Sequence, residues 1–269
     1  GMLFGAWAKR HYALPMDEAQ THAFKDVQAS TVRRMRGFAV EVWCQSLAFT
    51  LQTIHSVRLL PIPRGQAVGM PVLLLPGYTE NSGSMWWLAR RLARAGFNPI
   101  SIDFPSTFHP IERNAAFLGD RIAAIRAEHG GTKVAIVAHS MGGLITRSLM
   151  HAREDHGVHT LVAIGSPFRG SHFARVGSLL GWGASVSQMI PGCTFLQDYP
   201  PTRALPVATL SMVAFQESIV HPEWSVVIDG AQVRVLDEPY GHEAPLFVAG
   251  VFAEIEAWLV AQGVTRAVR

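Results

Sequence analysis

One serine of this sequence lies in a setting that suits a nucleophile. Residues 134–144 read Val-Ala-Ile-Val-Ala-His-Ser-Met-Gly-Gly-Leu, an aliphatic run followed by small residues and then by a helical pattern. In a sharp turn from strand to helix, little space remains two residues before and after the serine, and Ala138 and Gly142 fit that space around Ser140. A chance serine between small residues is the alternative. The strand-to-helix context favours an activated hydroxyl that attacks a carbonyl carbon.

Such an attack creates a negatively charged oxygen, and the sequence offers two backbone N–H groups to bind it. The first belongs to Met141, where a helix begins and its dipole favours negative charge. The second is expected from Tyr78, because Leu75-Pro76-Gly77-Tyr78-Thr79 directly follows an aliphatic run. Pro76-Gly77 alone predicts only a turn, but its place after a buried strand and ahead of Ser140 predicts a loop that binds the oxyanion.

The serine needs a base, and the chain has 12 histidines. His242 follows the last aliphatic run and precedes the C-terminal helical pattern, in a loop that can overhang the ends of the strands. His139 is the neighbour of the serine, and we expect it to order the turn rather than to take the proton. For the other histidines, surface or hydrogen-bonded roles are expected.

The elements that must position these residues alternate between short strands and helices. Aliphatic runs predict strands at 72–75, 99–103, 134–137, 161–164, 207–213 and 233–236. Helical periodicity is present at 84–95, 111–128, 141–152 and 245–260. This alternation predicts an α/β fold with a mostly parallel sheet of about six strands and helices on both faces.

Residues 168–206 interrupt this alternation with glycines and prolines among large apolar residues. A segment of this length without a strand pattern is typical of a lid or a binding loop. We expect its apolar side chains to form a substrate site, although the same residues would serve to pack the lid on the sheet. The candidates are Phe168, Phe173, Leu179, Leu180, Trp182, Met189 and Ile190.

The N-terminal part contains a strongly apolar helical pattern at 38–60. On a helical wheel its polar residues share one narrow stripe, made of Glu41, Gln45, Gln52 and His55. We expect the wide apolar face opposite this stripe to be buried against the protein's own domain or a second copy of the chain. Contact of residues 37–60 with a membrane surface is the second interpretation. A membrane span is the third, because the polar groups are costly in lipid.

The composition excludes several classes of protein. A chain of 269 residues suits one large domain, which we expect at 66–269 behind a helical extension at 1–65. The net charge is only +3 and the basic residues are scattered, so nucleic acid is not an expected partner. Cys44 and Cys193 lie far apart without CxxC spacing, so they predict neither a metal site nor a disulfide.

Lys9 and Arg10 follow the apolar stretch at 2–8 instead of preceding it, which argues against a signal peptide. The sequence therefore predicts a cytoplasmic location, with membrane association as the alternative. Gly1 ahead of Met2 is typical of a cloning remnant, so the loss of an export signal stays an open alternative.

Four segments, in order, resemble the lipase and carboxylesterase branch of the α/β-hydrolase fold, and the resemblance spans residues 70–262. They are Pro76-Gly77-Tyr78 with Pro in place of the family's His, Ala138-His-Ser-Met-Gly-Gly143 with Ala in place of Gly, Gly165-Ser-Pro-Phe-Arg-Gly-Ser171, and Gly241-His242. The resemblance implies Ser140 as nucleophile, His242 as base, and the amides of Tyr78 and Met141 as the oxyanion hole. It also implies hydrolysis of carboxylic esters, of lipid or fatty-acyl type, without cofactor or metal.

Of the catalytic residues, the acid that orients His242 has the weakest sequence signal. Lipases usually carry an Asp before a short apolar stretch and a Pro at this place, and Glu217-Ser-Ile-Val-His-Pro222 is the match. The resemblance thus implies Glu217, with a solvated surface glutamate as the alternative and Asp229, Asp198 and Asp237 as substitutes in that order. An amidase, thioesterase or acyltransferase on the same fold, or a non-enzymatic interaction protein, are the other functions.

Overall fold

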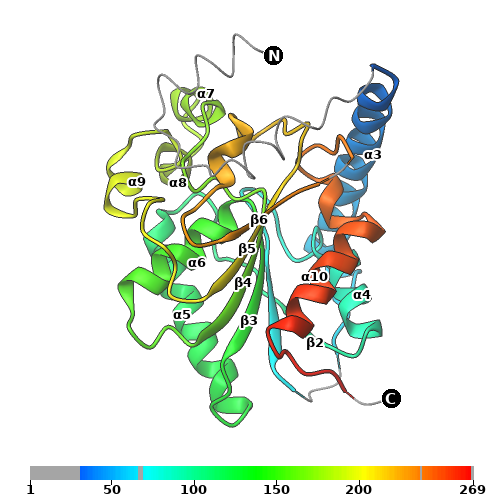
Figure 1. Ribbon diagram of the computed structural model, residues 1–269, viewed down its shortest axis with the longest axis vertical. Helices are drawn as coiled ribbons and strands as arrows, with labels where there is room; N and C mark the ends of the chain where they lie inside the picture. Colours follow the sequence, from blue (N-terminus) through cyan, green and yellow to red (C-terminus); the bar gives the residue numbers. More distant parts are fainter. Residues whose placement is uncertain (1–30, 66–68, 237, 268–269) are drawn as a thin grey trace.

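Six short aliphatic segments form one parallel sheet in the computed structural model, which describes residues 31–65, 69–236 and 238–267 (Figure 1). The strand order is β2-β1-β3-β4-β5-β6, and every hydrogen-bonded pair of neighbours is parallel. The strands are β1 (Pro71–Leu75), β2 (Asn98–Ser101), β3 (Val134–His139), β4 (Val158–Ile164), β5 (Ala208–Val213) and β6 (Gln232–Val235). The predicted fold class is confirmed.

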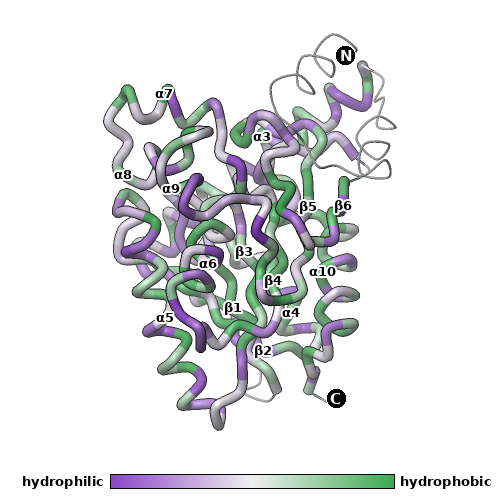
Figure 2. Tube along the Cα trace, turned by 60° about the vertical axis from the view of Figure 1, so that its left-hand side comes forward, coloured by the Kyte–Doolittle hydropathy of each residue, from purple (hydrophilic) through white to green (hydrophobic). Residues whose placement is uncertain are grey.

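The central strands are apolar at consecutive positions because both faces of the sheet are covered. Every residue of β1 and β3 is buried. Alternate residues serve opposite cores, since Leu73 and Leu75 belong to one apolar cluster and Val72 and Leu74 to the other. Figure 2, coloured by hydropathy, shows these strands as an apolar centre between helices of mixed polarity. Because the strands are parallel, their carboxyl ends meet at one edge of the sheet. Ser140 follows β3 at this edge.

Helices cover both faces of the sheet (Figure 1). On one side lie α5 (Ile111–Glu128) and α6 (Met141–Ala152), with the bounds expected from their periodicity. On the other side lie α4 (Trp86–Arg94), α10 (Ala249–Ala261) and the long N-terminal helix α3 (Thr31–Ser56). A short 3₁₀ helix, η2 (Ala244–Leu246), precedes α10, and another, η1 (Glu223–Val226), precedes β6. No helix in the described part of the chain is long and apolar enough to cross a membrane.

The segment between β4 and β5 folds into three short helices, α7 (Phe173–Leu179), α8 (Ala184–Ser187) and α9 (Thr194–Asp198). Polar contacts tie it to the loop after β2. The amide of Ala184 donates to the carbonyl of Phe108 at 3.1 Å, and the hydroxyl of Ser185 donates to the carbonyl of Thr107 at 2.6 Å. This lid segment is thereby held at the edge of the sheet where the strands end.

The side of α3 that packs on its own domain is not the apolar side that the sequence predicts. The helix packs on its own domain, but the buried residues are Gly37, Glu41, Cys44 and Ala48, so the side with Glu41 faces the protein. Large apolar side chains of the predicted pattern at 38–60 are exposed, namely Phe38, Val42, Trp43 and Phe49, as are Val32 and Met35 before it. The reason is close approach: small residues let the helix backbone come near the loop before His242, and Glu41 finds hydrogen-bond donors there.

Gly37 gives a test of this packing. A Cβ at position 37 would lie 2.0 Å from the carbonyl oxygen of Pro239, a backbone atom. Helix propensity alone favours alanine over glycine by about 1 kcal/mol. We nevertheless expect Gly37→Ala to lower the free energy of unfolding, by about 1–3 kcal/mol, because the clash forces α3 away from the loop. Thermal and urea unfolding, followed by circular dichroism, measure the change.

Gly250, in α10, provides the matched control, because a Cβ there would meet no heavy atom within 4 Å. Gly250→Ala should leave the stability unchanged or raise it slightly. If Gly37→Ala were as stable as Gly250→Ala, the close docking of α3 on this loop would be refuted.

Candidate functional site

Ser140 lies at the junction of β3 and α6 in a strained backbone conformation. Its φ of 49° and ψ of −120° fall in a region that residues other than glycine rarely adopt. The surrounding contacts explain the small neighbours. A Cβ at Gly142 would lie 3.0 Å from the carbonyl oxygen of Leu75, and one at Gly143 would lie 2.2 Å from Oγ of Ser166. The amide of Ser140 donates to the carbonyl of Ile164 at 2.8 Å, which anchors the turn to β4.

His242 lies in the loop between β6 and α10, and its side chain is almost fully buried. Nδ1 of the imidazole lies 2.9 Å from Oε2 of Glu217, so the hydrogen bond expected between these residues is present. Gly165, at the end of β4, leaves room for the pair, because a Cβ there would lie 3.3 Å from the imidazole and 3.4 Å from the carboxylate. With Nδ1 engaged, Nε2 is the ring nitrogen that remains for a proton transfer.

Glu217 is not the solvated glutamate of the alternative interpretation, since its side chain is only 1% exposed. Its other oxygen, Oε1, accepts the amides of Ile219 at 2.9 Å and Val220 at 3.2 Å. Burial opposes ionisation of this carboxyl, but the charge of His242 and these hydrogen bonds outweigh it and lower the pKa of Glu217. The side chain is therefore a fixed anion beside the imidazole.

The substitute acids have other surroundings. Asp229 forms an ion pair with Arg169, and the nitrogen and oxygen are 3.5 Å apart. Asp198 is the exposed last residue of α9. Asp237 lies outside the described residues.

Two backbone amides frame Ser140. Gly77 approaches it so closely that a Cβ at position 77 would lie 2.9 Å from Cβ of Ser140, which brings the loop with Tyr78 beside the serine. Met141 is the first residue of α6. Within the described part of the chain, no hydrogen bond uses the N–H of Tyr78 or of Met141. Both donors are thus available to an oxygen bound at Ser140.

Ser140 and His242 open on one cavity of about 670 Å³, a size that suits a small ligand. Three of the lid residues expected to form a substrate site line it, namely Phe173, Trp182 and Met189. Residues of α3 contribute a further wall that the sequence did not reveal, made of Gln45, Ala48, Phe49 and Gln52. The remaining lining has an apolar part, made of Phe108, Pro167, Ala174, Val186, Ile219 and Val220, and a polar part, made of Tyr78, Thr79, Glu80, Ser171 and Glu243.

The other lid candidates do not line this cavity. Phe168 is completely buried, with the guanidinium of Arg147 stacked 5.4 Å from its ring centre. Leu179 and Leu180 point to solvent, with exposed fractions of 89% and 63%. Ile190 packs on the core behind the cavity and does not line it. Periodicity cannot separate these residues from the lining ones, because seven residues of α7 make less than two complete turns.

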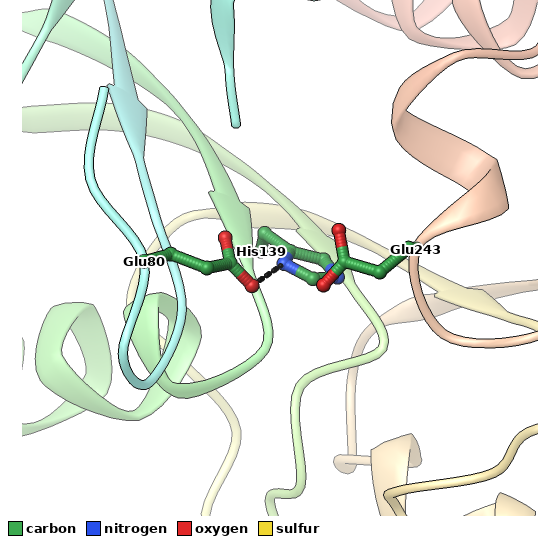
Figure 3. A group of neighbouring side chains, drawn as sticks. All are labelled: Glu80, His139 and Glu243. Atoms are coloured by element: carbon green, nitrogen blue, oxygen red, sulfur yellow. Dashed lines mark hydrogen bonds and ion pairs between the residues drawn. The ribbon is translucent and has the colours of Figure 1, made fainter. Parts of the chain in front are cut away.

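A cluster of titratable groups behind His242 was also missed. Glu80 and Glu243 approach His139 from opposite sides (Figure 3). Nδ1 of His139 lies 2.8 Å from Oε1 of Glu80, and Nε2 lies 3.1 Å from the backbone carbonyl oxygen of His242. Glu80 also accepts the amide of Gly77 at 3.0 Å, so it connects the loop of Tyr78 to the turn at Ser140. His139 orders the turn, and the carboxylate that helps it comes from a loop with no distinguishing motif.

The three side chains have ligand atoms within 4.8 Å of one another, a spacing that a metal ion needs. Both nitrogens of His139 already face oxygen acceptors, however, so neither offers a lone pair without breaking a buried hydrogen bond. Two acceptors favour the imidazolium. The cluster therefore fits protons better than a metal.

The charges follow the same geometry. Burial opposes a charge on His139, but Glu80 and Glu243 outweigh it and raise the pKa of His139 to about 10. Burial likewise opposes a charge on Glu80, and His139 outweighs it, lowering the pKa of Glu80 to about 2. For Glu243, burial and then repulsion by Glu80 raise the pKa well above its ordinary value. A buried imidazolium–carboxylate pair of His139 and Glu80 results.

This pair predicts a pH dependence of stability. The folded pKa of His139, about 10, lies above its ordinary value of 6.5, so the folded state holds this proton more tightly than the unfolded chain does. The contribution of His139 is therefore fully present below pH 6.5, decreases as the pH rises, and is lost beyond pH 10. Urea unfolding of the wild type and of His139→Asn at a series of pH values measures it. The difference in stability should shrink from neutral to alkaline pH; a constant or growing difference would contradict the assignment.

Parts of the chain are similar in sequence to known proteins. A sequence model described as the alpha/beta hydrolase fold matches residues 70–182. Cutinase 2 of Thermobifida cellulosilytica is 36% identical over 101 residues, which cover 35% of this chain and 38% of the relative. Cutinase cut1 of Thermobifida fusca shows the same identity over 35% of this chain and 32% of its own length. The match thus spans only about a third of the length of these relatives.

Two of the solved structures that have a similar fold each cover most of this chain. A Bacillus licheniformis lipase in its mature form has a TM-score of 0.62 at 17% identity, covering 74% of this chain and 96% of its own. Lipase B of Aspergillus fumigatus has a TM-score of 0.59 at 19% identity, covering 71% and 52%. With the parallel six-stranded sheet and the strained serine turn, these similarities identify the chain as a protein of the α/β-hydrolase fold.

Proposed function

We propose that this protein is a serine hydrolase that cleaves carboxylic esters through an acyl-enzyme on Ser140. One observation carries the proposal: the strained serine and the buried Glu217–His242 pair open on the same, largely apolar cavity. The similarity to proteins named cutinases and lipases supports it.

In the proposed reaction, Nε2 of His242 takes the proton of the Ser140 hydroxyl while Oγ attacks the ester carbonyl carbon. The amides of Tyr78 and Met141 donate to the oxyanion of the tetrahedral intermediate. His242 then gives the proton to the departing alcohol. Water, deprotonated by the same imidazole, attacks the acyl-enzyme, and Ser140 recovers its proton as the acid leaves. Glu217 holds Nδ1 of His242 throughout and balances the imidazolium charge.

The cavity favours a fatty-acyl or other lipid-type ester as substrate. Its lining combines aromatic residues of the lid, such as Phe173 and Trp182, with Phe49 of α3. An apolar acyl chain would lose its water-exposed surface there, at a gain of about 25 cal/mol per Å² buried. The fold itself does not determine the leaving group, so amides and thioesters belong in any substrate profile.

We further propose that contact with a lipid surface or a second copy uses residues 37–60. The exposed apolar side chains of α3, including Phe38, Val42, Trp43 and Phe49, support this contact. Under this proposal the helix belongs to the α/β domain in its packing, while residues 1–30 of the expected extension lie outside the described residues.

The first test concerns the nucleophile. Ser140→Ala should reduce the turnover of p-nitrophenyl esters by at least ~10³-fold and abolish covalent labelling by a fluorophosphonate, because the hydroxyl that attacks in the proposed reaction is then absent. Peptide mapping of the labelled wild type should find the probe on Ser140. Ser178→Ala, in α7, removes a partly exposed hydroxyl and should retain both activities. Near-normal turnover in Ser140→Ala would refute the serine-hydrolase mechanism.

A second test concerns the acyl site in the lid. Trp182 lines the cavity, whereas Leu179 lies in the same lid and is exposed to solvent. Trp182→Ala should lower kcat/KM for p-nitrophenyl decanoate relative to the acetate by ~10–100-fold, because an acyl pocket discriminates chains through 1–3 kcal/mol of apolar contact. Leu179→Ala should leave the ratio unchanged. Equal losses on both esters in Trp182→Ala would indicate a purely structural lid.

A further inference from the structure

Glu41 joins the N-terminal helix to the segment that carries His242. Although the residues are 202 and 203 positions apart in sequence, one carboxylate oxygen accepts the amide of Glu243 at 2.9 Å and the other accepts the amide of Ala244 at 2.9 Å. Both amides follow His242 directly in the chain. Gln45, one turn along α3, donates to Glu41 at 3.2 Å and restricts its side chain. A buried carboxylate held by two backbone donors has a single well-defined position.

The residue before His242 is adapted to the same contact. A Cβ at Gly241 would lie 2.4 Å from Cδ and 2.7 Å from Oε2 of Glu41, so any side chain there would displace the carboxylate. Glu41 thus packs against the chain on both sides of His242. The docking of α3 around it is equally close, since Gly37 meets the backbone of Pro239 in the same loop.

The backbone of His242 is therefore restrained from two directions. His139, at the serine turn, binds its carbonyl oxygen, and Glu41, from α3, binds the next two amides. The imidazole is bound at only one nitrogen by Glu217, and the other must stay available for Ser140. The backbone of His242 therefore has to supply the rest of the restraint on the position of the imidazole.

We propose that Glu41 is a positioning residue for His242, which makes helix α3 a working part of the active site and not a dispensable extension. This inference rests on the proposed function of Ser140 and His242. Glu41 does not line the cavity, so it acts through the loop and not through the substrate.

The substitutions Glu41→Gln and Glu41→Ala test the proposal in graded fashion. Glutamine keeps one acceptor and turns an N–H toward the second amide, whereas alanine removes both acceptors. Turnover of p-nitrophenyl acetate should fall by ~10-fold in Glu41→Gln and ~100-fold in Glu41→Ala, since a shift of about 1 Å in a catalytic group has this effect. KM should remain within about twofold, because the cavity is unchanged. The second-order rate of fluorophosphonate labelling should fall in parallel with kcat.

Folding defects are separated from misplacement by counting sites. Prolonged fluorophosphonate titration gives the fraction of molecules with a competent Ser140, and kcat is then expressed per labelled site. The proposal requires that kcat per site falls. A reduced number of sites with normal kcat per site would overturn it, because Glu41 would then serve stability alone.

Arg33→Ala is the matched control. Arg33 lies on the same helix and its ion pair with Glu238, at 3.2 Å, reaches the same loop, but both side chains are about half exposed. Such a pair contributes little, so kcat per site should equal that of the wild type. Equal effects of Arg33→Ala and Glu41→Gln would also contradict the proposal. A wild type that fails to label at Ser140 would instead refute the proposed function.

Discussion

The position of the His242 imidazole is the constraint on which the rest of the site depends. Its bond of 2.9 Å to Glu217 orders the ring, but Glu217 can do so only because two amides hold its own second oxygen. The segment of His242 is in turn held by His139 and Glu41. Each of these groups is buried, and a buried polar group is costly unless it is hydrogen-bonded, so these contacts are what make the groups tolerable there. The polar network and the apolar sheet are thus parts of one packing arrangement.

The strained backbone conformation of Ser140 is maintained by contacts with the neighbouring strands and loops. Small residues at 142 and 143 allow the turn to lie against β1 and the loop after β4, and the amide of Ser140 is tied to β4. The pair of Glu80 and His139 links this turn to the loop of Gly77. The rings of His139 and His242 have centres 4.6 Å apart, and the carboxylate of Glu80 balances the positive charge of His139 beside this second imidazole.

Local patterns predicted much of this structure, and tertiary contacts determined the rest. The strands, α5, α6 and the turn at Ser140 have strong local signals, since burial on both faces and steric demands act over a few residues. Glu217 was found through its resemblance to a family pattern. Glu41 and Glu80 have no such signal, because their partners are distant in sequence: backbone amides after His242 for Glu41, and the imidazole of His139 for Glu80. The side of α3 that packs on its own domain was predicted wrongly for a related reason: close backbone contact, which hydropathy does not register, decided which side is buried.

The central claim is that Ser140, two backbone amides and His242 form one acyl-transfer site, and a crystal structure of the fluorophosphonate adduct tests it most directly. In this adduct, phosphorus should be bonded to Oγ of Ser140. One phosphoryl oxygen should lie within about 3.2 Å of the amide nitrogens of Tyr78 and Met141. The alkyl group should occupy the cavity beside Phe173 and Trp182. An adduct on another side chain would contradict the assignment of Ser140 as nucleophile. A phosphoryl oxygen directed away from both amides would contradict the assignment of the oxyanion hole.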